Sequence, residues 1–245
     1  MSMPLHYSYS DLSKMIDHSL LNPALTWDEL EQGIEVALAY DVASVCILPY
    51  ALKHCAGRLR GSDVRPGTTI GFPHGGHTTA IKLAEAREGL NNGAEELDMV
   101  VNISKVVSGD WTYVANDIGE VLAVTHAEGR KLKVIFENAY LDDDQKIRLC
   151  EISGELGVDW VKTSTGYAAT GATDEDLILM RKHSPAHVQV KAAGGIRDLD
   201  ALLRVRALGV TRCGATRTVA MMDEARRRLG LAPITAPMAV ETKGY

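Results

Sequence analysis

The stretch DDQKIRLCEISGELGVDWVKTS, residues 143–164, contains the two patterns that decide the fold. In residues 143–157, apolar side chains recur at three- and four-residue spacing, which indicates an amphipathic helix that ends at Gly157. The short apolar run DWVKTS, residues 159–164, then indicates a buried strand with a polar end. A helix followed at once by a strand is the repeating unit of an α/β protein.

The same alternation extends along the chain in both directions. The eight expected strands are MIDHSLL (15–21), VASVCIL (42–48), TTIGF (68–72), EELDMVV (95–101), LKVIFE (132–137), DWVKTS (159–164), VQVKAA (188–193) and VTRCGA (210–215). Further amphipathic helices are expected at residues 27–40, 78–93 and 111–129. Helices are expected to end at Gly93, Gly129, Gly157 and Gly209. The expected N-caps are Thr26, Asp142 or Asp143, and Thr173 or Asp174.

Eight strand–helix units predict a single (β/α)8 TIM barrel. The competing doubly wound sheet usually has fewer strands and a clear switch point. Neither a GxGxxG motif nor a Walker A motif is present in the 245 residues. We expect one barrel domain over residues 1–230, with a short N-terminal extension, and a flexible C-terminal tail over residues 231–245.

Composition narrows the classes of function. The chain is 46% hydrophobic and 24% charged, with a formal net charge of −6, so nucleic acid is not an expected partner. A local positive site for a small phosphorylated ligand remains compatible with that charge. The four cysteines have no CxxC spacing, and no metal site is predicted. No apolar run reaches membrane-spanning length and no secretory leader is visible, so we expect a cytoplasmic protein without membrane contact.

Two lysines near the ends of consecutive strands are the most informative residues. Lys162 and Lys191 would lie on neighbouring strands about 4.8 Å apart. Repulsion and burial would both lower the pKa of one of these amines, and a neutral amine can form a Schiff base with a carbonyl. Asp98, two strands away, could relay a proton or hold a water. Taken singly, either lysine could instead reach solvent or pair with a carboxylate, and Asp98 could be structural.

Other polar residues also interrupt the strands. Asp17 lies in the first strand, and Cys46 near the end of the second is expected to be a small apolar filler that faces the barrel. Glu137, at the end of the fifth, is expected to form an ion pair at the rim. The histidines form no recognisable metal-binding set, and we expect loop or rim positions for His18, for His77 and for His74, a possible neighbour of the substrate.

Glycine-bearing loops follow the last three strands. In a TIM barrel the loops after strands seven and eight frequently bind phosphate through backbone amides. The candidates there are Gly194, Gly195, Gly214, Thr216 and Arg217, and Thr163 and Gly166 after the sixth strand would form the floor of the same pocket. The alternative is that these segments are ordinary tight turns.

Five motifs together resemble the deoxyribose-phosphate aldolase family. They are IDHSLL (16–21), IGFPHG (70–75), ELDMVVNI (96–103), VKTSTGY (161–167) and KAAGGIR (191–197), in the family's order and spacing. The resemblance covers the chain from about Met15 to Gly230. It implies a class I aldolase that reversibly cleaves 2-deoxy-D-ribose 5-phosphate to acetaldehyde and D-glyceraldehyde 3-phosphate, with neither metal nor cofactor, and a homodimer or higher homo-oligomer.

The resemblance also implies a role for each matching residue. Lys162 would form the Schiff base, Lys191 would lower its pKa, and Asp98 would act with a water in proton transfer. Cys46 would line the pocket and Asp17 would lie near the substrate hydroxyls. The phosphate would bind at Gly166, Gly195, Gly214 and Thr216. The residues alone do not select which lysine is the nucleophile.

Three other functions are alternatives to this one. A related Schiff-base aldolase or thiolase, acting on another small phosphorylated carbonyl compound, would share the two lysines. A non-catalytic sugar-phosphate-binding barrel would be expected to lack Lys162, Lys191 or Asp98, and all three are present. A metal-dependent hydrolase would need clustered histidine and carboxylate ligands at the strand ends.

Overall fold

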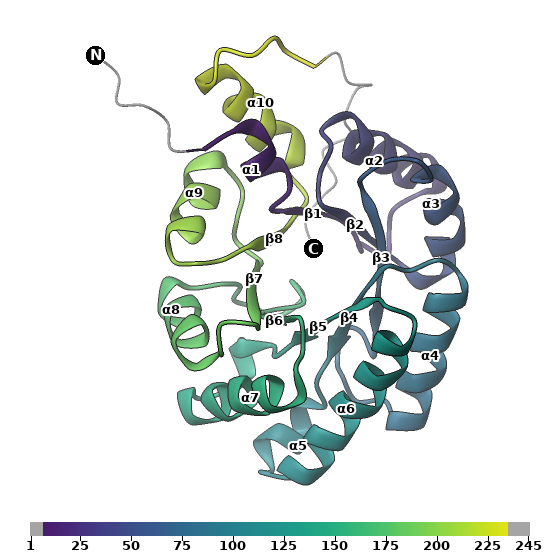
Figure 1. Ribbon diagram of the computed structural model, residues 1–245, viewed down its shortest axis with the longest axis vertical. Helices are drawn as coiled ribbons and strands as arrows, with labels where there is room; N and C mark the ends of the chain where they lie inside the picture. Colours follow the sequence, from purple (N-terminus) through teal and green to yellow (C-terminus); the bar gives the residue numbers. More distant parts are fainter. Residues whose placement is uncertain (1–6, 235–245) are drawn as a thin grey trace.

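A closed barrel of eight parallel strands forms the centre of the structure, a computed structural model that describes residues 7–234 (Figure 1). The strands are β1 (Ile16–Leu20), β2 (Ser44–Ile47), β3 (Arg65–Ile70), β4 (Glu96–Val100), β5 (Lys131–Ile135), β6 (Trp160–Lys162), β7 (Gln189–Ala193) and β8 (Arg212–Ala215). They pair in chain order, and β8 closes the barrel on β1. The (β/α)8 prediction is therefore confirmed, and the doubly wound sheet is excluded.

Helices surround the barrel on its outer side (Figure 1). They are α1 (Tyr9–Ser13), α2 (Trp27–Ala39), α3 (Leu52–Arg58), α4 (Thr79–Asn91), α5 (Ile103–Val107), α6 (Trp111–Ala127), α7 (Asp143–Leu156), α8 (Asp174–His183), α9 (Leu199–Ala207) and α10 (Thr218–Arg228), with 3₁₀ turns η1 (Pro49–Ala51) and η2 (Asn138–Tyr140). Over residues 7–234, every helix is too short or too polar to cross a membrane.

The predicted helix ends agree with the observed ones. Thr26, Asp142 and Thr173 are N-caps, and each side chain accepts a hydrogen bond from the third residue of its helix. The four glycines expected to end helices all have left-handed φ angles, between 65° at Gly129 and 96° at Gly93. Only glycine adopts this conformation without a steric cost, so each can turn the chain from a helix into the next strand.

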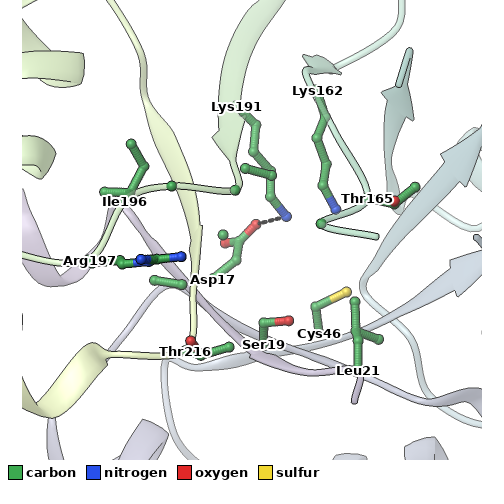
Figure 2. Close-up of a pocket in the computed structure, with 16 residues that line it drawn as sticks. Asp17, Ser19, Leu21, Cys46, Lys162, Thr165, Lys191, Ile196, Arg197 and Thr216 are labelled. Carbon is green, nitrogen blue, oxygen red and sulfur yellow. Dashed lines mark ion pairs between the residues drawn. The ribbon is translucent and has the colours of Figure 1, made fainter. Parts of the chain in front are cut away.

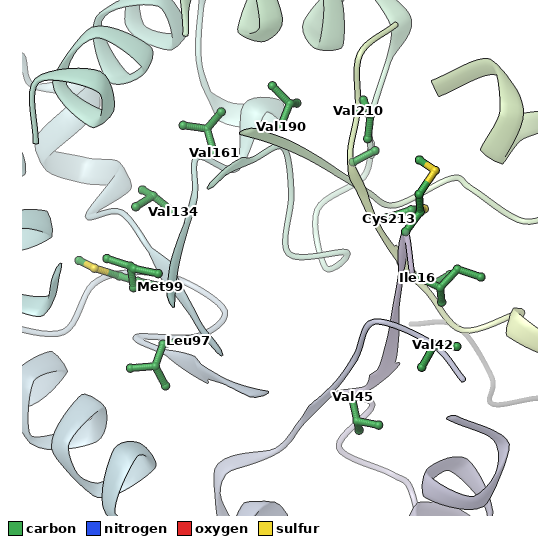
Figure 3. Close-up of a cluster of buried hydrophobic side chains, with 14 of the residues drawn as sticks. Ile16, Val42, Val45, Leu97, Met99, Val134, Val161, Val190, Val210 and Cys213 are labelled. Carbon is green, nitrogen blue, oxygen red and sulfur yellow. The ribbon is translucent and has the colours of Figure 1, made fainter. Parts of the chain in front are cut away.

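The apolar core lies between the barrel and its helices rather than inside the barrel. Side chains that alternate along each strand point outward and pack beneath the helices, as Val45, Met99, Val161 and Val190 do (Figure 3). The inward positions are strongly polar, whereas the interior of a TIM barrel is usually filled by branched apolar residues. The inward set contains buried charges from six strands, β1 and β4 to β8, and these charges belong to the candidate active site.

Several strand boundaries differ from the expected ones, and part of the chain lies outside the described residues. β6 spans three residues and is shorter than its predicted run, and Gly214 lies within β8 rather than in the loop that follows. Of the predicted tail, residues 231–234 are described. Residues 235–245, with Tyr245, lie outside the described residues, so the tail and the domain boundary at residue 230 stay predictions.

Gly75 provides a test of how tightly the β3–α4 loop packs against β4. Its φ is 69°, and a Cβ built there would lie 1.8 Å from the carbonyl oxygen of Val101. We expect Gly75→Ala to lower the free energy of unfolding by about 3 kcal/mol, because a left-handed alanine is strained and the backbone must move.

The neighbouring Gly76 is a matched control, since a Cβ there has no heavy atom within 4 Å. Gly76→Ala should change the unfolding free energy by less than about 0.5 kcal/mol in urea titrations. Equal effects of the two substitutions would contradict this account of the loop.

Candidate active site

Lys162 and Lys191 lie side by side across β6 and β7, where their Cα atoms are register partners. Asp98 reaches them from β4, and one carboxylate oxygen accepts a hydrogen bond from each ammonium, at 2.7 Å from Lys162 Nζ and 2.8 Å from Lys191 Nζ. All three side chains are buried, with residue exposures of 3% or less. The structure therefore brings these three candidate residues together.

Asp17 joins this group from β1. Its Oδ2 lies 2.5 Å from Lys191 Nζ (the dashed line in Figure 2) and accepts a hydrogen bond from Lys133 Nζ at 2.9 Å. The Lys133 ammonium also lies 3.0 Å from Asp98 Oδ1 and 2.6 Å from Glu96 Oε2. Lys133 therefore links three carboxylates inside the barrel.

Arg212 closes the network at the opposite end of the barrel interior. Its guanidinium donates to Asp17 Oδ1 and, at 2.7 Å, to Glu96 Oε1, and it lies 5.1 Å from the ring of Trp160. Three carboxylates thus face four cations in a buried cluster of seven side chains. We call this set the interior ion network, and it comprises Asp17, Glu96, Asp98, Lys133, Lys162, Lys191 and Arg212.

We expected one lysine of the pair to have a lowered pKa, and for Lys162 this expectation is wrong. Burial is the largest single influence and lowers the pKa of Lys162, but the charge and the hydrogen bond of Asp98, together with Cys46, hold that pKa above its usual value. Burial alone would raise the pKa of Asp98, yet the ammonium groups of Lys133, Lys162 and Lys191 keep it far below its usual range. In this state Lys162 is a protonated amine held by a carboxylate.

A cavity of about 110 Å³ opens above the network at the carboxyl ends of the strands (Figure 2). Nine of the predicted site residues line it: Asp17, Cys46, Lys162, Gly166, Lys191, Gly194, Gly195, Gly214 and Thr216. Asp98 lies beneath this lining, in contact with both lysines. Thr163 does not line the cavity; its hydroxyl donates to the carbonyl oxygen of Ala193 and accepts from its N–H, which ties the end of β6 to β7.

Sequence reasoning missed several residues of the site. The cavity is also lined by Ser19, Leu21, Thr165, Ala193, Ile196, Arg197 and Ala215, and the ion network adds Glu96, Lys133 and Arg212. Strand alternation contained a signal for some of them. Ser19 follows Asp17 by two residues, and Glu96 precedes Asp98 by two, so each pair must face the same side of its strand.

We expected Glu137 to form an ion pair at the rim, and this expectation is wrong. It is buried, has a left-handed φ of 58°, and accepts hydrogen bonds from the backbone N–H and the hydroxyl of Thr165. Burial raises the pKa of its carboxyl group. Glu137 therefore holds the beginning of the β6–α8 loop, which carries Thr165 and Gly166 into the cavity wall.

The expected position is wrong for His18, and it is correct for His74, His77 and Cys46. His18 is buried rather than at the rim, and its Nδ1 lies 2.8 Å from the Thr218 hydroxyl. His74 and His77 are exposed, as expected, and neither lines the cavity. Cys46 faces the barrel, as expected, and burial raises the pKa of its thiol to about 11.

Comparison with known proteins identifies the family. Residues 12–216 match the family model described as "DeoC/LacD family aldolase". The chain belongs to the DeoC/LacD family of aldolases. A relative named "Deoxyribose-phosphate aldolase" from Rhodopirellula baltica is 64% identical over 239 residues, which cover 98% of this chain and 99% of the relative.

Solved structures agree with this DeoC/LacD assignment. A putative deoxyribose-phosphate aldolase from Coccidioides immitis superposes with a TM-score of 0.85 at 33% identity, covering 90% of this chain and 87% of that one. A deoxyribose phosphate aldolase from Aeropyrum pernix, described as a unique tetrameric structure, superposes with a TM-score of 0.83 at 28% identity, covering 91% and 93%.

The carboxylate of Asp98, which three ammonium groups share, leads to a prediction about the stability of this DeoC/LacD aldolase. We expect Asp98→Asn to lower the free energy of unfolding by about 3–5 kcal/mol, because three buried ammonium groups lose their common counter-charge. Asp110→Asn is the matched control, since Asp110 pairs with Lys105 at the surface and asparagine can also cap α6. Urea titrations should show a loss below about 1 kcal/mol for this control. Equal losses would contradict the role given to Asp98.

The buried position of His18 leads to a prediction about how the free energy of unfolding depends on pH. Burial lowers its pKa to about 4 in the folded chain, whereas an unfolded histidine titrates near 6.5. Between these values the unfolded chain binds the extra proton, so stability is lost as the pH falls from about 6.5 to about 4. We expect wild type to lose about 3 kcal/mol more than His18→Gln over this window, measured by urea titration at each pH. Parallel pH profiles would contradict this.

Proposed function

We propose that this chain is a class I aldolase that reversibly cleaves 2-deoxy-D-ribose 5-phosphate to acetaldehyde and D-glyceraldehyde 3-phosphate, through a Schiff base on Lys162. The observation that carries the proposal is a buried amine facing a cavity, with Asp98 and a second amine in direct contact. Names of the family's relatives point to the same substrate. The proposed reaction uses groups already in place around that cavity.

The contacts of the two lysines differ in a way that favours Lys162 as the nucleophile. Lys191 Nζ is held by two carboxylates, with Asp17 at 2.5 Å and Asp98 at 2.8 Å. Lys162 Nζ has one carboxylate partner, Asp98, in the described part of the chain. A substrate has to displace fewer strong contacts to reach Lys162, so its amine is the more available for attack.

Activation of Lys162 requires its separation from Asp98. The carboxylate stabilises the protonated amine, so a carbonyl group entering between them removes the interaction that raises the pKa. Burial and the Lys191 ammonium then both favour the neutral amine. That amine attacks C1 of the open-chain sugar, and loss of water leaves a protonated imine.

Asp98 and Lys191 then serve the proton transfers. A water held by this pair takes the proton of the C3 hydroxyl, the C2–C3 bond breaks, and the electron pair moves into the imine to give an enamine. D-glyceraldehyde 3-phosphate leaves, the enamine is protonated at C2, and hydrolysis releases acetaldehyde and restores Lys162. Lys191 is held in position by its two carboxylate partners, Asp17 and Asp98.

The phosphate is proposed to bind at the glycine-rich side of the cavity. Gly166, Gly194 and Gly195 all have left-handed φ angles, which let the backbone approach an anion closely. Gly214 and Thr216 complete this wall, and the exposed Arg197 lies opposite Lys162 across the cavity (Figure 2). A guanidinium suits a phosphate dianion at the open end.

Assembly and location are also proposals. We propose a homodimer or higher homo-oligomer, supported by the tetrameric relative from A. pernix. We propose a cytoplasmic location, supported by four cysteines that are all free thiols, one of them in the cavity wall. We keep residues 1–230 as the proposed barrel domain.

Trapping of the intermediate tests the assignment of Lys162. Borohydride reduction in the presence of deoxyribose 5-phosphate should leave a covalent adduct on Lys162, located by peptide mass spectrometry. Lys162→Met should abolish the adduct and lower the cleavage rate roughly 10³-fold or more, because no amine reaches the carbonyl. The exposed Lys182→Met is the control and should retain both. An adduct on Lys191 in wild type would overturn the assignment.

A further inference from the structure

A second and larger cavity lies at the opposite end of the barrel from the proposed active site. Its volume is about 910 Å³, and we call it the amino-end cavity. Its lining includes residues just before or at the starts of β2, β3 and β4, such as Ala43, Arg65 and Glu95. TIM-barrel chemistry takes place at the other end, so this cavity is unused by the aldolase reaction proposed above.

Cationic side chains without carboxylate partners gather in this cavity. Lys53, Arg60 and Arg65 line it, and none forms an ion pair with any of residues 7–234. Among the acidic lining residues, Glu95 is engaged by Arg130 at 3.5 Å. The lining is therefore locally positive in a chain whose formal net charge is −6.

Two features of the lining reduce that positive charge without removing it. Asp63 contributes one carboxylate. The C-terminal ends of α3 and α4 also face this side, and each helix end contributes roughly half a negative charge. Lys14 adds nothing, because its ammonium is held by Asp41 at 2.6 Å. Three unpaired cations still exceed these contributions.

Arg212 connects the amino-end cavity to the active site. It lines this cavity, and the same guanidinium donates to Asp17 and Glu96 in the interior ion network. Asp17 in turn contacts Lys191, which shares Asp98 with Lys162. An anion that binds the Arg212 guanidinium would weaken the interaction between Arg212 and Asp17. It would thereby change the electrostatic field around Lys162 and Lys191.

The lining also limits the chemistry of the ligand. No aromatic side chain is among the residues that line the amino-end cavity, so a nucleobase would find no stacking surface. Guanidinium groups bind phosphate oxygens in a bidentate manner, and the volume falls within the range of small-molecule sites. We propose that this cavity binds a compact phosphorylated small molecule with at least two negative charges, and that binding is coupled to the active site through Arg212.

Binding is tested with inorganic diphosphate and the full chain by isothermal titration calorimetry. Deoxyribose 5-phosphate is present at saturation in both cell and syringe and is left to equilibrate with any cleavage products beforehand, so that the proposed active-site phosphate subsite is occupied and no net reaction contributes heat. We expect one diphosphate per chain, bound at least 10-fold more weakly by the double variant Arg60→Gln/Arg65→Gln. The matched control Arg87→Gln/Arg204→Gln removes two exposed charges elsewhere and should bind diphosphate as wild type does.

Three results would overturn the binding proposal. They are equal losses of affinity in the two double variants, displacement of all bound diphosphate by deoxyribose 5-phosphate, and a change of oligomeric state in the Arg60/Arg65 variant, which would make this face an interface between copies of the chain. None of these results depends on catalysis, so the binding test can fail or succeed independently of the proposed aldolase activity.

Coupling is tested separately and rests on the proposed function. Saturating diphosphate should change the rate of borohydride-trapped adduct formation on Lys162 by at least 2-fold in wild type. The rate without diphosphate should be the same in wild type and in the Arg60→Gln/Arg65→Gln variant, and diphosphate should leave the variant's rate unchanged. An unchanged rate in wild type despite proven binding would overturn the role given to Arg212.

Discussion

The carboxylate of Asp98 is the group on which the rest of the site depends. Three buried ammonium groups lie within 3.0 Å of its two oxygens, and they belong to three successive strands. Without that charge, Lys133, Lys162 and Lys191 would repel one another in a region from which water is largely excluded. Burial of each lysine is tolerable only because the carboxylates are buried with it, so the network forms as a unit.

A barrel that fills its interior with charges must obtain its stability elsewhere. Here the apolar layer between strands and helices provides that stability, with Val45, Met99 and Val190 fully buried beneath the helices (Figure 3). Strand alternation separates the two tasks, since successive residues face opposite sides of the sheet. In β4, Leu97 and Met99 face the helices while Glu96 and Asp98 face the interior. The same short strand thus contributes to the core and to the chemistry.

Features that depend on local sequence were predictable. Strand and helix order followed from periodicity, and the pairing of Lys162 with Lys191 followed from consecutive strands in a closed barrel. Contacts across the barrel were not predictable in the same way. The pKa of Lys162 is set by a residue 64 positions away that meets it only when the barrel closes. Glu137 likewise accepts a hydrogen bond from Thr165, 28 positions along the chain. Its left-handed φ angle could not be predicted from the sequence either.

The charge balance of the network reconciles a raised lysine pKa with the proposed chemistry. Asp17, Glu96 and Asp98 face four cations when every group is ionised, so the cluster carries one surplus positive charge. Loss of one proton from Lys162 would leave three charges of each sign. The pairwise contact with Asp98 opposes that loss, whereas the cluster as a whole favours it once a substrate breaks the contact. A protonated imine on Lys162 then restores the surplus charge, and Asp98 again has a cationic neighbour at the position from which the amine was displaced.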